Sequence, residues 1–246
     1  MLKTLCAAAL ATGLALPAAA FDMTAMTKAE RQAFGDEVRA YLLENPQVLM
    51  EAIAVLESRE QQAQASSDAD LIAQNAAALF DGDDWVGGNP DGDITVVEFL
   101  DYRCGYCRRA FPEVEELIES DGNIRLIVKE FPILGEQSTL ASRFAIATQL
   151  VAGDDAYEAV HDGLMTMRAD VTPDSLADLA EEAGLDFAEI EARMDSEEVN
   201  TRISETLALG QAMGVNGTPS FVFGDQMVRG YVPLDAMRQI VEDERG

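Results

Sequence analysis

The chain has 246 residues, of which 48% are hydrophobic and 25% are charged, values typical of a folded protein rather than a disordered one. Its 45 acidic residues outnumber 17 basic residues and give a formal net charge of −28. Such a surface repels nucleic-acid phosphates and anionic lipid, so we expect neither nucleic acid nor a membrane surface as a partner.

The first twenty residues are typical of an export signal. Lys3 precedes an apolar run from Leu5 to Leu16, and small residues follow up to Ala20. This order predicts a signal peptide over 1–20 that is cleaved after about Ala20, and therefore a protein of the periplasm. Cys6 would leave with this segment, so the mature chain keeps two of the three cysteines.

Residues 21–80 are expected to form a separate, helical N-terminal segment. After a polar leader over 22–32, apolar residues recur at three- and four-residue steps, and Pro46 interrupts the pattern. This predicts two helices between about 33 and 64, with Asn45 as the N-cap of the second. A further amphipathic stretch is expected over 67–79. The apolar stripe needs a partner, which is either the rest of the chain or a second subunit.

A loop rich in glycine and aspartate over 81–90 predicts the boundary of a second domain, residues 81–246. Patterns of apolar residues predict its strands over 94–100, 124–131, 220–223 and about 227–230. Helical patterns follow the cysteines, fill residues 136–213 and return over 234–243. Turn residues divide the long helical stretch at 153–155, 172–174 and 184–186.

The two remaining cysteines, Cys104 and Cys107, have the spacing C-x-x-C at the start of the first predicted helix of this domain. Free N–H groups and the dipole at a helix N-terminus lower the pKa of a thiol, which favours Cys104 as the attacking thiolate. Cys107, one turn further, is expected to be buried and to resolve the mixed disulfide. A bridge that closes so short a loop adds little stability, so the spacing favours redox chemistry over a structural cross-link. Arg108 and Arg109 either stabilise the thiolate further or are solvated.

A closed zinc site needs four ligands, whereas the mature chain offers this cysteine pair and one histidine, His161. We therefore expect no resident metal and no cofactor. Two thiolates are nevertheless suitable ligands for Cu(I).

Residues 96–107, with the sequence VVEFLDYRCGYC, resemble the active-site strand and helix start of the DsbA family. Arg108, Pro112, the segment 129–134 and the run Gly217-Thr218-Pro219 match the same family. The resemblance implies an α/β, thioredoxin-like fold with a helical domain inserted at about 136–213 and an N-terminal helical extension.

The same resemblance implies roles for individual residues. Cys104 and Cys107 are the catalytic pair, and Glu98 is an acid beneath them that assists proton transfer from the buried cysteine. Substrate backbone is expected to meet Thr218 and Pro219, with a cis peptide bond before the proline. Gly105 and Tyr106, between the cysteines, are also expected to contact substrate.

Two further resemblances refine this picture. Residues 37–49 resemble the N-terminal segment of ScsC-like and Com1-like members, which implies a homo-oligomer through residues 33–64. The pair Gly105-Tyr106, with Thr218 before the key proline, resembles DsbC-type isomerases and lacks the histidine of a strong oxidase. Cys104 should therefore be less acidic, and its disulfide less oxidising, than in a strong oxidase.

Three functions stay open. We favour a disulfide isomerase that exchanges disulfides with protein substrates and is kept reduced by a membrane redox partner. The first alternative is a DsbA-like dithiol oxidase. The second is a copper-stress protein whose thiols bind Cu(I).

Overall fold

The computed structural model describes residues 26–246, so the predicted signal peptide and Cys6 lie outside the described residues. The chain divides into two compact units, 1–59 and 60–246. This division falls earlier than the expected boundary at 80/81, because Ile72 and Leu79 are buried in the core of the second unit. Within residues 26–246, no helix combines the length and the apolarity needed to cross a bilayer.

The described part of the first unit contains helix α1 (Lys28–Glu44) and the beginning of helix α2 (Gln47–Gln74). α1 begins before the expected residue 33, because the Thr27 and Glu30 side chains form a capping box at its start. Asn45 is the C-cap of α1, where its side chain donates to the Tyr41 carbonyl, and not the N-cap that we expected. α2 continues through residues 65–67, which contain no glycine or proline to break it.

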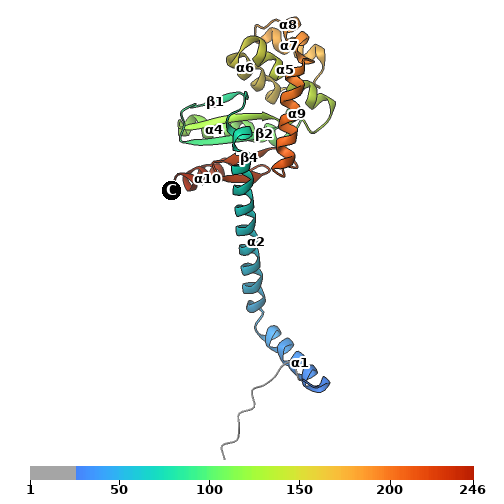
Figure 1. The fold of residues 1–246 in the computed structure, drawn as a ribbon, viewed down its shortest axis with the longest axis vertical. Helices are drawn as coiled ribbons and strands as arrows, with labels where there is room; N and C mark the ends of the chain where they lie inside the picture. Colours follow the sequence, from blue (N-terminus) through green and yellow to red (C-terminus); the bar gives the residue numbers. More distant parts are fainter. Residues whose placement is uncertain (1–25) are drawn as a thin grey trace, which may run out of the picture. The chain divides into compact units, whose positions relative to one another are not determined.

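The second unit is built on a mixed five-stranded sheet with the order β1-β3-β2-β4-β5 (Figure 1). Its strands are β1 (Val86–Gly88), β2 (Ile94–Leu100), β3 (Ile124–Glu130), β4 (Ser220–Phe223) and β5 (Gln226–Arg229). β2 and β3 are parallel, as expected for the two strands of a strand–helix–strand unit, and the other pairs are antiparallel. β1 lies within the region that we expected to be a loop, because two of its three residues are glycines and hide the strand pattern.

Helices cover both faces of the sheet. Side chains alternate along β2, so Val96 and Leu100 enter one core and Val97 and Phe99 the other. α4 (Gly105–Asp121) and α10 (Leu234–Arg245) cover the first face, and α9 (Glu197–Ala212) and α3 (Ala76–Phe80) contribute to the core on the second. The central strands are thereby buried on both faces.

The inserted helices lie between β3 and β4 in the chain and gather beside the sheet (Figure 1). They are α5 (Glu136–Ala152), α6 (Asp154–Thr166), α7 (Pro173–Glu182), α8 (Phe187–Met194) and α9. All three expected breaks are confirmed as helix boundaries. The expected α/β, thioredoxin-like fold with a helical insertion and an N-terminal helical extension is therefore confirmed.

Candidate active site

Cys104 lies where the chain leaves β2 and enters α4. It is the N-cap of α4, and the backbone N–H of Cys107 points to its sulfur, with a distance of 3.4 Å from N to Sγ. The Cys104 thiol donates a hydrogen bond to the Thr218 carbonyl, 3.1 Å away. Cys104 is 7% exposed, so the expected accessibility is limited to a small part of its surface.

Hydrogen bonds donated to the Cys104 sulfur stabilise its thiolate form. A bond with the Cys107 thiol is the largest cause, and bonds with the Thr218 side chain and with the N–H groups of Cys107 and Tyr106 add to it. Together they outweigh the effect of burial and lower the pKa of Cys104 to about 5. Cys104 is therefore a thiolate at neutral pH, which is the reactive form in disulfide exchange.

Cys107 lies only one helical turn away, but its surroundings favour the protonated thiol. Its side chain is fully buried, and this burial raises the pKa of its thiol far above the usual range. The charge of Glu98 raises it further. Cys107 is therefore a thiol at neutral pH and must lose its proton before it attacks a disulfide.

Glu98 lies on β2 between Val96 and Leu100, on the face that α4 covers. It is buried, and this burial, followed by the charge of Cys104, raises the pKa of its carboxyl group to about 8. Its Oε1 has no hydrogen-bond partner among the described residues. A carboxyl group with such a pKa is able to accept and to donate a proton near neutral pH.

The loop before β4 completes this group of residues. The peptide bond between Thr218 and Pro219 is cis, as the resemblance implied. The structure thus brings Cys104, Cys107 and Thr218 together from segments far apart in the chain. Gly105 has open space around it, and Tyr106 is 60% exposed and stacks on Tyr231 with ring centroids 6.3 Å apart.

Arg108 and Arg109, which follow the cysteine pair, contact groups other than the Cys104 sulfur. The Arg108 guanidinium donates to the carbonyls of Tyr102, Leu164 and Met167, and so joins the active-site loop to the end of α6. The Arg109 guanidinium lies 4.4 Å from the centre of the Tyr231 ring. Because Arg108 bonds to these carbonyls and Arg109 contacts the Tyr231 ring, the structure gives neither arginine a direct contact with the Cys104 thiolate.

Sequence reasoning missed Asp101, a fully buried carboxylate at the end of β2. Its two oxygens accept hydrogen bonds from the backbone N–H groups of Arg103, at 2.8 Å, and of Ile133 and Leu134, at 2.8 and 3.0 Å. It therefore fixes the loop that carries Cys104 to the loop after β3. The one available signal was a charged residue directly after an apolar strand.

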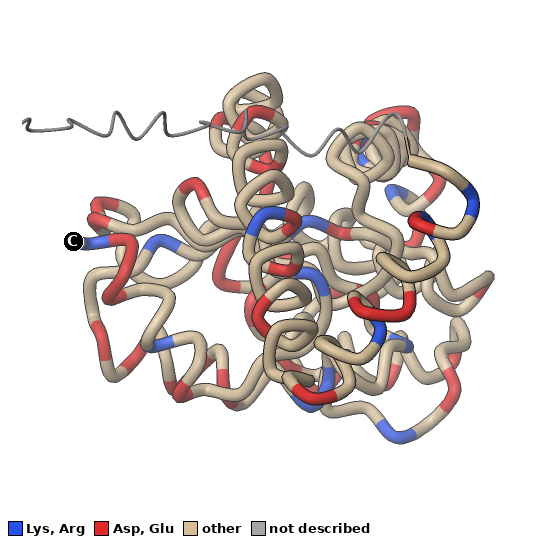
Figure 2. The backbone as a smooth tube through the Cα atoms, turned by 90° about the horizontal axis from the view of Figure 1, so that it is seen from below, with Lys and Arg blue, Asp and Glu red and all other residues tan. Residues whose placement is uncertain are grey.

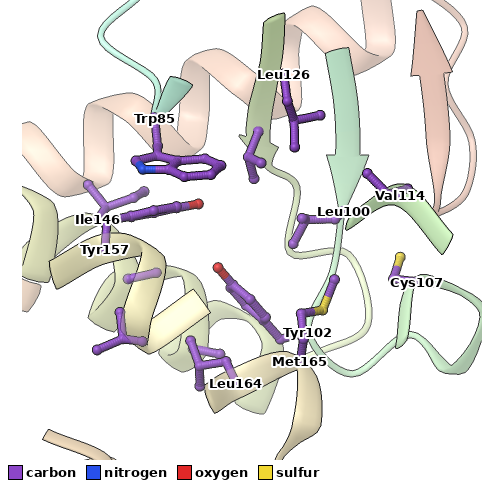
Figure 3. Packing of buried hydrophobic residues seen from close by; sticks show 14 of the residues in the cluster. Trp85, Leu100, Tyr102, Cys107, Val114, Leu126, Ile146, Tyr157, Leu164 and Met165 are labelled. Carbon is purple, nitrogen blue, oxygen red and sulfur yellow. The ribbon is translucent and has the colours of Figure 1, made fainter. Parts of the chain in front are cut away.

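A buried polar cluster beside the site was also missed. Glu130 accepts hydrogen bonds from the hydroxyl groups of Tyr102 and Tyr157, at 2.7 and 2.6 Å. His161 contacts the Tyr102 hydroxyl through Nδ1 at 3.0 Å, and Trp85 stacks on Tyr157 (Figure 3). Burial lowers the pKa of His161 to about 4, so this histidine is neutral at pH 7.

Acidic residues outnumber basic ones in the chain. Figure 2 shows Asp and Glu recurring along its loops and helices, with fewer Lys and Arg between them. Among residues 26–246, no group of three or more His, Cys, Asp and Glu side chains is arranged to hold a metal ion.

Comparisons with known proteins agree with this geometry. The family model described as a DSBA-like thioredoxin domain matches residues 95–242, and the model described as the copper resistance protein ScsC N-terminal domain matches residues 30–63. The chain spans about a quarter of the length of the first curated relatives that it matches. These are sodium/proton antiporters, among them one of Salinispora arenicola, 28% identical over 158 residues, or 64% of this chain and 24% of the antiporter.

Several solved structures are similar. A thioredoxin-like oxidoreductase from Silicibacter pomeroyi is 42% identical, with a TM-score of 0.65, and the match covers 69% of this chain and 96% of that one. A periplasmic thioredoxin-like protein from Salmonella enterica is 30% identical, with a TM-score of 0.62 and coverage of 69% and 94%. ScsC from Proteus mirabilis is 26% identical, with a TM-score of 0.65, and the match extends over 91% of this chain and 98% of that one.

Proposed function

The chain belongs to the family of DsbA-like thioredoxin domains, and from this premise we propose that it is an exported thiol-disulfide oxidoreductase acting on protein substrates. One observation carries the proposal. Two cysteines one helical turn apart have opposite properties, since the pKa of Cys104 is lowered to about 5 and that of Cys107 is raised. A reactive thiolate beside a protonated thiol suits attack followed by resolution. The similar periplasmic protein from Salmonella enterica and the expected signal peptide support the periplasm as the location.

The catalytic cycle follows from these surroundings. The Cys104 thiolate attacks a substrate disulfide and forms a mixed disulfide, and one substrate sulfur leaves as a thiolate. This step removes the negative charge of Cys104, which is one cause of the raised pKa of Glu98. The pKa of Glu98 thus falls, so a larger fraction of its carboxyl group is ionised and free to accept a proton when Cys107 must be deprotonated. Cys107 then attacks Cys104 and releases the second substrate sulfur.

Substrate recognition is proposed for the surface around Cys104. Thr218 and Pro219 lie beside its sulfur and offer backbone groups to an extended peptide. Tyr106 at the start of α4, and Ile133 and Leu134 on the loop after β3, are exposed apolar side chains, and Gly105 leaves room for a close approach. An apolar surface of this kind suits unfolded segments of other proteins.

Among the finer functions we favour disulfide isomerisation by an oligomer. In support, Phe34, Val38 and Tyr41 on α1, and Leu49, Ile53 and Leu56 on α2, follow steps of four and three residues and are exposed. These two rows suit contact with a second copy of the chain. Several active sites around one substrate suit the rearrangement of wrong disulfides, for which a membrane partner would keep the cysteines reduced.

Two alternatives have support of their own. A pKa of about 5 for Cys104 lies between the values of about 7 for thioredoxin and about 3.5 for DsbA, so a dithiol oxidase stays open. The description of the matching N-terminal model, copper resistance protein ScsC, favours a thiol protein that binds Cu(I). Two thiolates suit that ion.

The test of the proposed chemistry is the capture of mixed disulfides. Cys107→Ser should retain substrates on Cys104 as covalent complexes, because the resolving thiol is absent. Cys104→Ser should retain none, and the double variant serves as the control. Complexes formed by Cys104→Ser and not by Cys107→Ser would contradict the assigned roles. A redox titration of the protein then separates the isomerase from the oxidase, since a potential as oxidising as that of DsbA, about −120 mV, would favour the oxidase.

A further inference from the structure

A row of side chains on α4 leads away from the cysteine pair. Tyr106, Arg109 and Glu113 follow steps of three and four residues, so they lie on one face of the helix. Tyr231, on the loop between β5 and α10, contacts all three. Its ring stacks on Tyr106 and lies 4.4 Å from the Arg109 guanidinium, and its hydroxyl donates to Glu113 Oε1 at 2.7 Å. We call these four residues the Tyr231 cluster.

The Tyr231 cluster borders the path that we expect a substrate to follow. The N–H of Gly230 donates to the Pro219 carbonyl at 2.9 Å, so the loop that carries Tyr231 is joined to the loop of the cis-proline. Thr218, directly before this proline, accepts the hydrogen bond of the Cys104 thiol. The cluster also includes a residue from between the two cysteines. A peptide joined to Cys104 therefore has the cluster within reach of side chains close to its own cysteine.

Arg109 is an exposed cation in this cluster. Among the described residues its guanidinium forms no ion pair, whereas Arg103, Arg143 and Arg245 in the same unit each contact an aspartate. The contrast is clearest with Arg103, which is also next to the active site and is paired with Asp170. In a chain of net charge −28, Arg109 is therefore a cation beside the site that can still accept an acidic partner.

The fold keeps the nearest carboxylate away from Arg109. Glu113 lies four residues further along α4, which is the usual spacing for an ion pair on a helix. Its Oε1 accepts the hydrogen bond of the Tyr231 hydroxyl instead, and its Oε2 accepts from the backbone N–H of Leu234 at 2.7 Å. Both oxygens are thus engaged by the loop before α10, and Arg109 contacts only the face of the Tyr231 ring.

We propose that the Tyr231 cluster is a specificity subsite, in which Arg109 binds an aspartate or glutamate of the substrate close to its reacting cysteine. The inference rests on the proposed thiol-disulfide exchange with protein substrates. Tyr231 and Glu113 are positioning residues, because the ring holds the guanidinium by a cation–π contact and the carboxylate holds the ring. The subsite offsets locally the repulsion between this acidic chain and an acidic substrate segment.

The test compares pairs of short peptides that differ only in a glutamate or a glutamine, placed in turn at each position near a single cysteine. A disulfide joins this cysteine to a coloured aromatic thiol. The Cys104 thiolate of the reduced full-length protein attacks the peptide sulfur and forms a mixed disulfide. The bond to the aromatic sulfur breaks, and this sulfur leaves with the electron pair as the coloured thiolate. The ratio of the two rate constants of release, glutamate over glutamine, measures the preference.

We expect Arg109→Gln to lower this ratio about three- to fivefold at one or more positions, because exposed ion pairs contribute little free energy individually. Arg109→Lys should keep most of the preference, since it keeps the charge. Arg109→Glu should lower the ratio further than Arg109→Gln. Salt at about 0.5 M should weaken the preference of the unmodified protein, because ions screen an exposed pair.

The positioning role has a separate test. Tyr231→Phe keeps the ring but removes the hydroxyl, so Glu113 Oε1 becomes free to pair with Arg109. The ratio should fall towards that of Arg109→Gln. Adding Glu113→Gln to Tyr231→Phe should restore it, because the competing charge is then absent. A ratio that Tyr231→Phe leaves unchanged would overturn the role assigned to Tyr231 and Glu113.

Arg238→Gln on α10 is the matched control. It also removes one partly exposed arginine, but this side chain contacts Glu116, about 18 Å along α4 from Cys104, and the ratio should not change. A ratio that is the same in the unmodified protein and in folded Arg109→Gln and Arg109→Glu at every position overturns the subsite. If no peptide reacts faster with the unmodified protein than with Cys104→Ser, the proposed thiol-disulfide exchange itself is wrong.

Discussion

The two units of the chain differ in the burial of their apolar side chains. Residues 60–246 bury aromatic and aliphatic side chains on both faces of a sheet. Within residues 26–59 no residue is buried, and large apolar side chains are exposed along both helices. The second unit therefore contains its own source of stability, whereas the first has apolar surface that only a further contact can cover. In the proposed function the chemistry belongs to the second unit, and the exposed apolar rows of the first are proposed as a means of association.

The largest effect should come from the core of the second unit. Phe99→Ala removes a fully buried ring that packs edge-on against Phe131. We expect the free energy of unfolding to fall by about 3–5 kcal/mol. Leu43→Ala is the control, because Leu43 is 66% exposed on α1 and lies outside the apolar row, and it should change the value by less than about 0.5 kcal/mol. Denaturant titration followed by Trp85 fluorescence measures both, and equal losses would contradict the contrast between the units.

The second prediction concerns the reactivity of Cys104, which should not depend on the first unit. With a pKa lowered to about 5, Cys104 should react with iodoacetamide at pH 6 about 100-fold faster than an ordinary thiol. The rate should reach half its maximum near pH 5 and fall at lower pH, where the sulfur is protonated. Cys104→Ser should abolish this fast reaction. A half-maximum near pH 8.5, the ordinary value for cysteine, would refute the proposed thiolate.

The third prediction concerns the late part of α2, which belongs to the second unit. The Asp68 carboxylate accepts two hydrogen bonds of 2.8 Å from the Arg229 guanidinium on β5. These bonds lower the pKa of Asp68, so the pair stabilises the fold above the unfolded pKa of about 4 and loses this effect as pH falls through the lower folded value. Asp68→Asn should cost about 1–3 kcal/mol at pH 7.

The difference between Asp68→Asn and the unmodified protein should shrink in acid, where the unmodified carboxylate is itself protonated. Asp70→Asn, at an exposed position in the same turn, is the control and should change stability little. Thermal unfolding from pH 7 to pH 3 measures both variants. A loss for Asp68→Asn that stays constant over this range would show that the carboxylate charge does not stabilise the fold.

The sequence predicted the parts of the fold that depend on local pattern. β2 has the expected ends, because seven residues that are all apolar or β-branched except Glu98 are bounded by turn residues and the cysteine motif. The position of Cys104 at the start of α4 follows from the same local signals. β1 was missed because a short edge strand with two glycines has no side-chain pattern to read.

Long-range contacts explain why the sequence did not predict the roles of some residues in the site. Asp101 has its role because the loop at Ile133 returns to it, and Glu130 because α6 brings Tyr157 over the sheet. The acidic side chains of α4 and α6 that line one cavity, among them Glu115 and Asp162, likewise meet only because the two helices lie side by side. Spacing along the chain predicts neighbours within a helix or strand, whereas these groups meet only after the inserted helices pack.

The most direct test of the account is reactivation of an enzyme with scrambled disulfides by the full-length protein, compared with Ile53→Asp and Val55→Asp. Both side chains are about half exposed on α2, but Ile53 lies in the apolar row with Leu49 and Leu56, and Val55 lies on another side of the helix. We predict that Ile53→Asp loses both association and reactivation while it still oxidises a reduced peptide, and that Val55→Asp keeps all three. Full reactivation by an Ile53→Asp protein that sedimentation shows to be monomeric would contradict the account, because isomerisation would then not depend on the N-terminal helices.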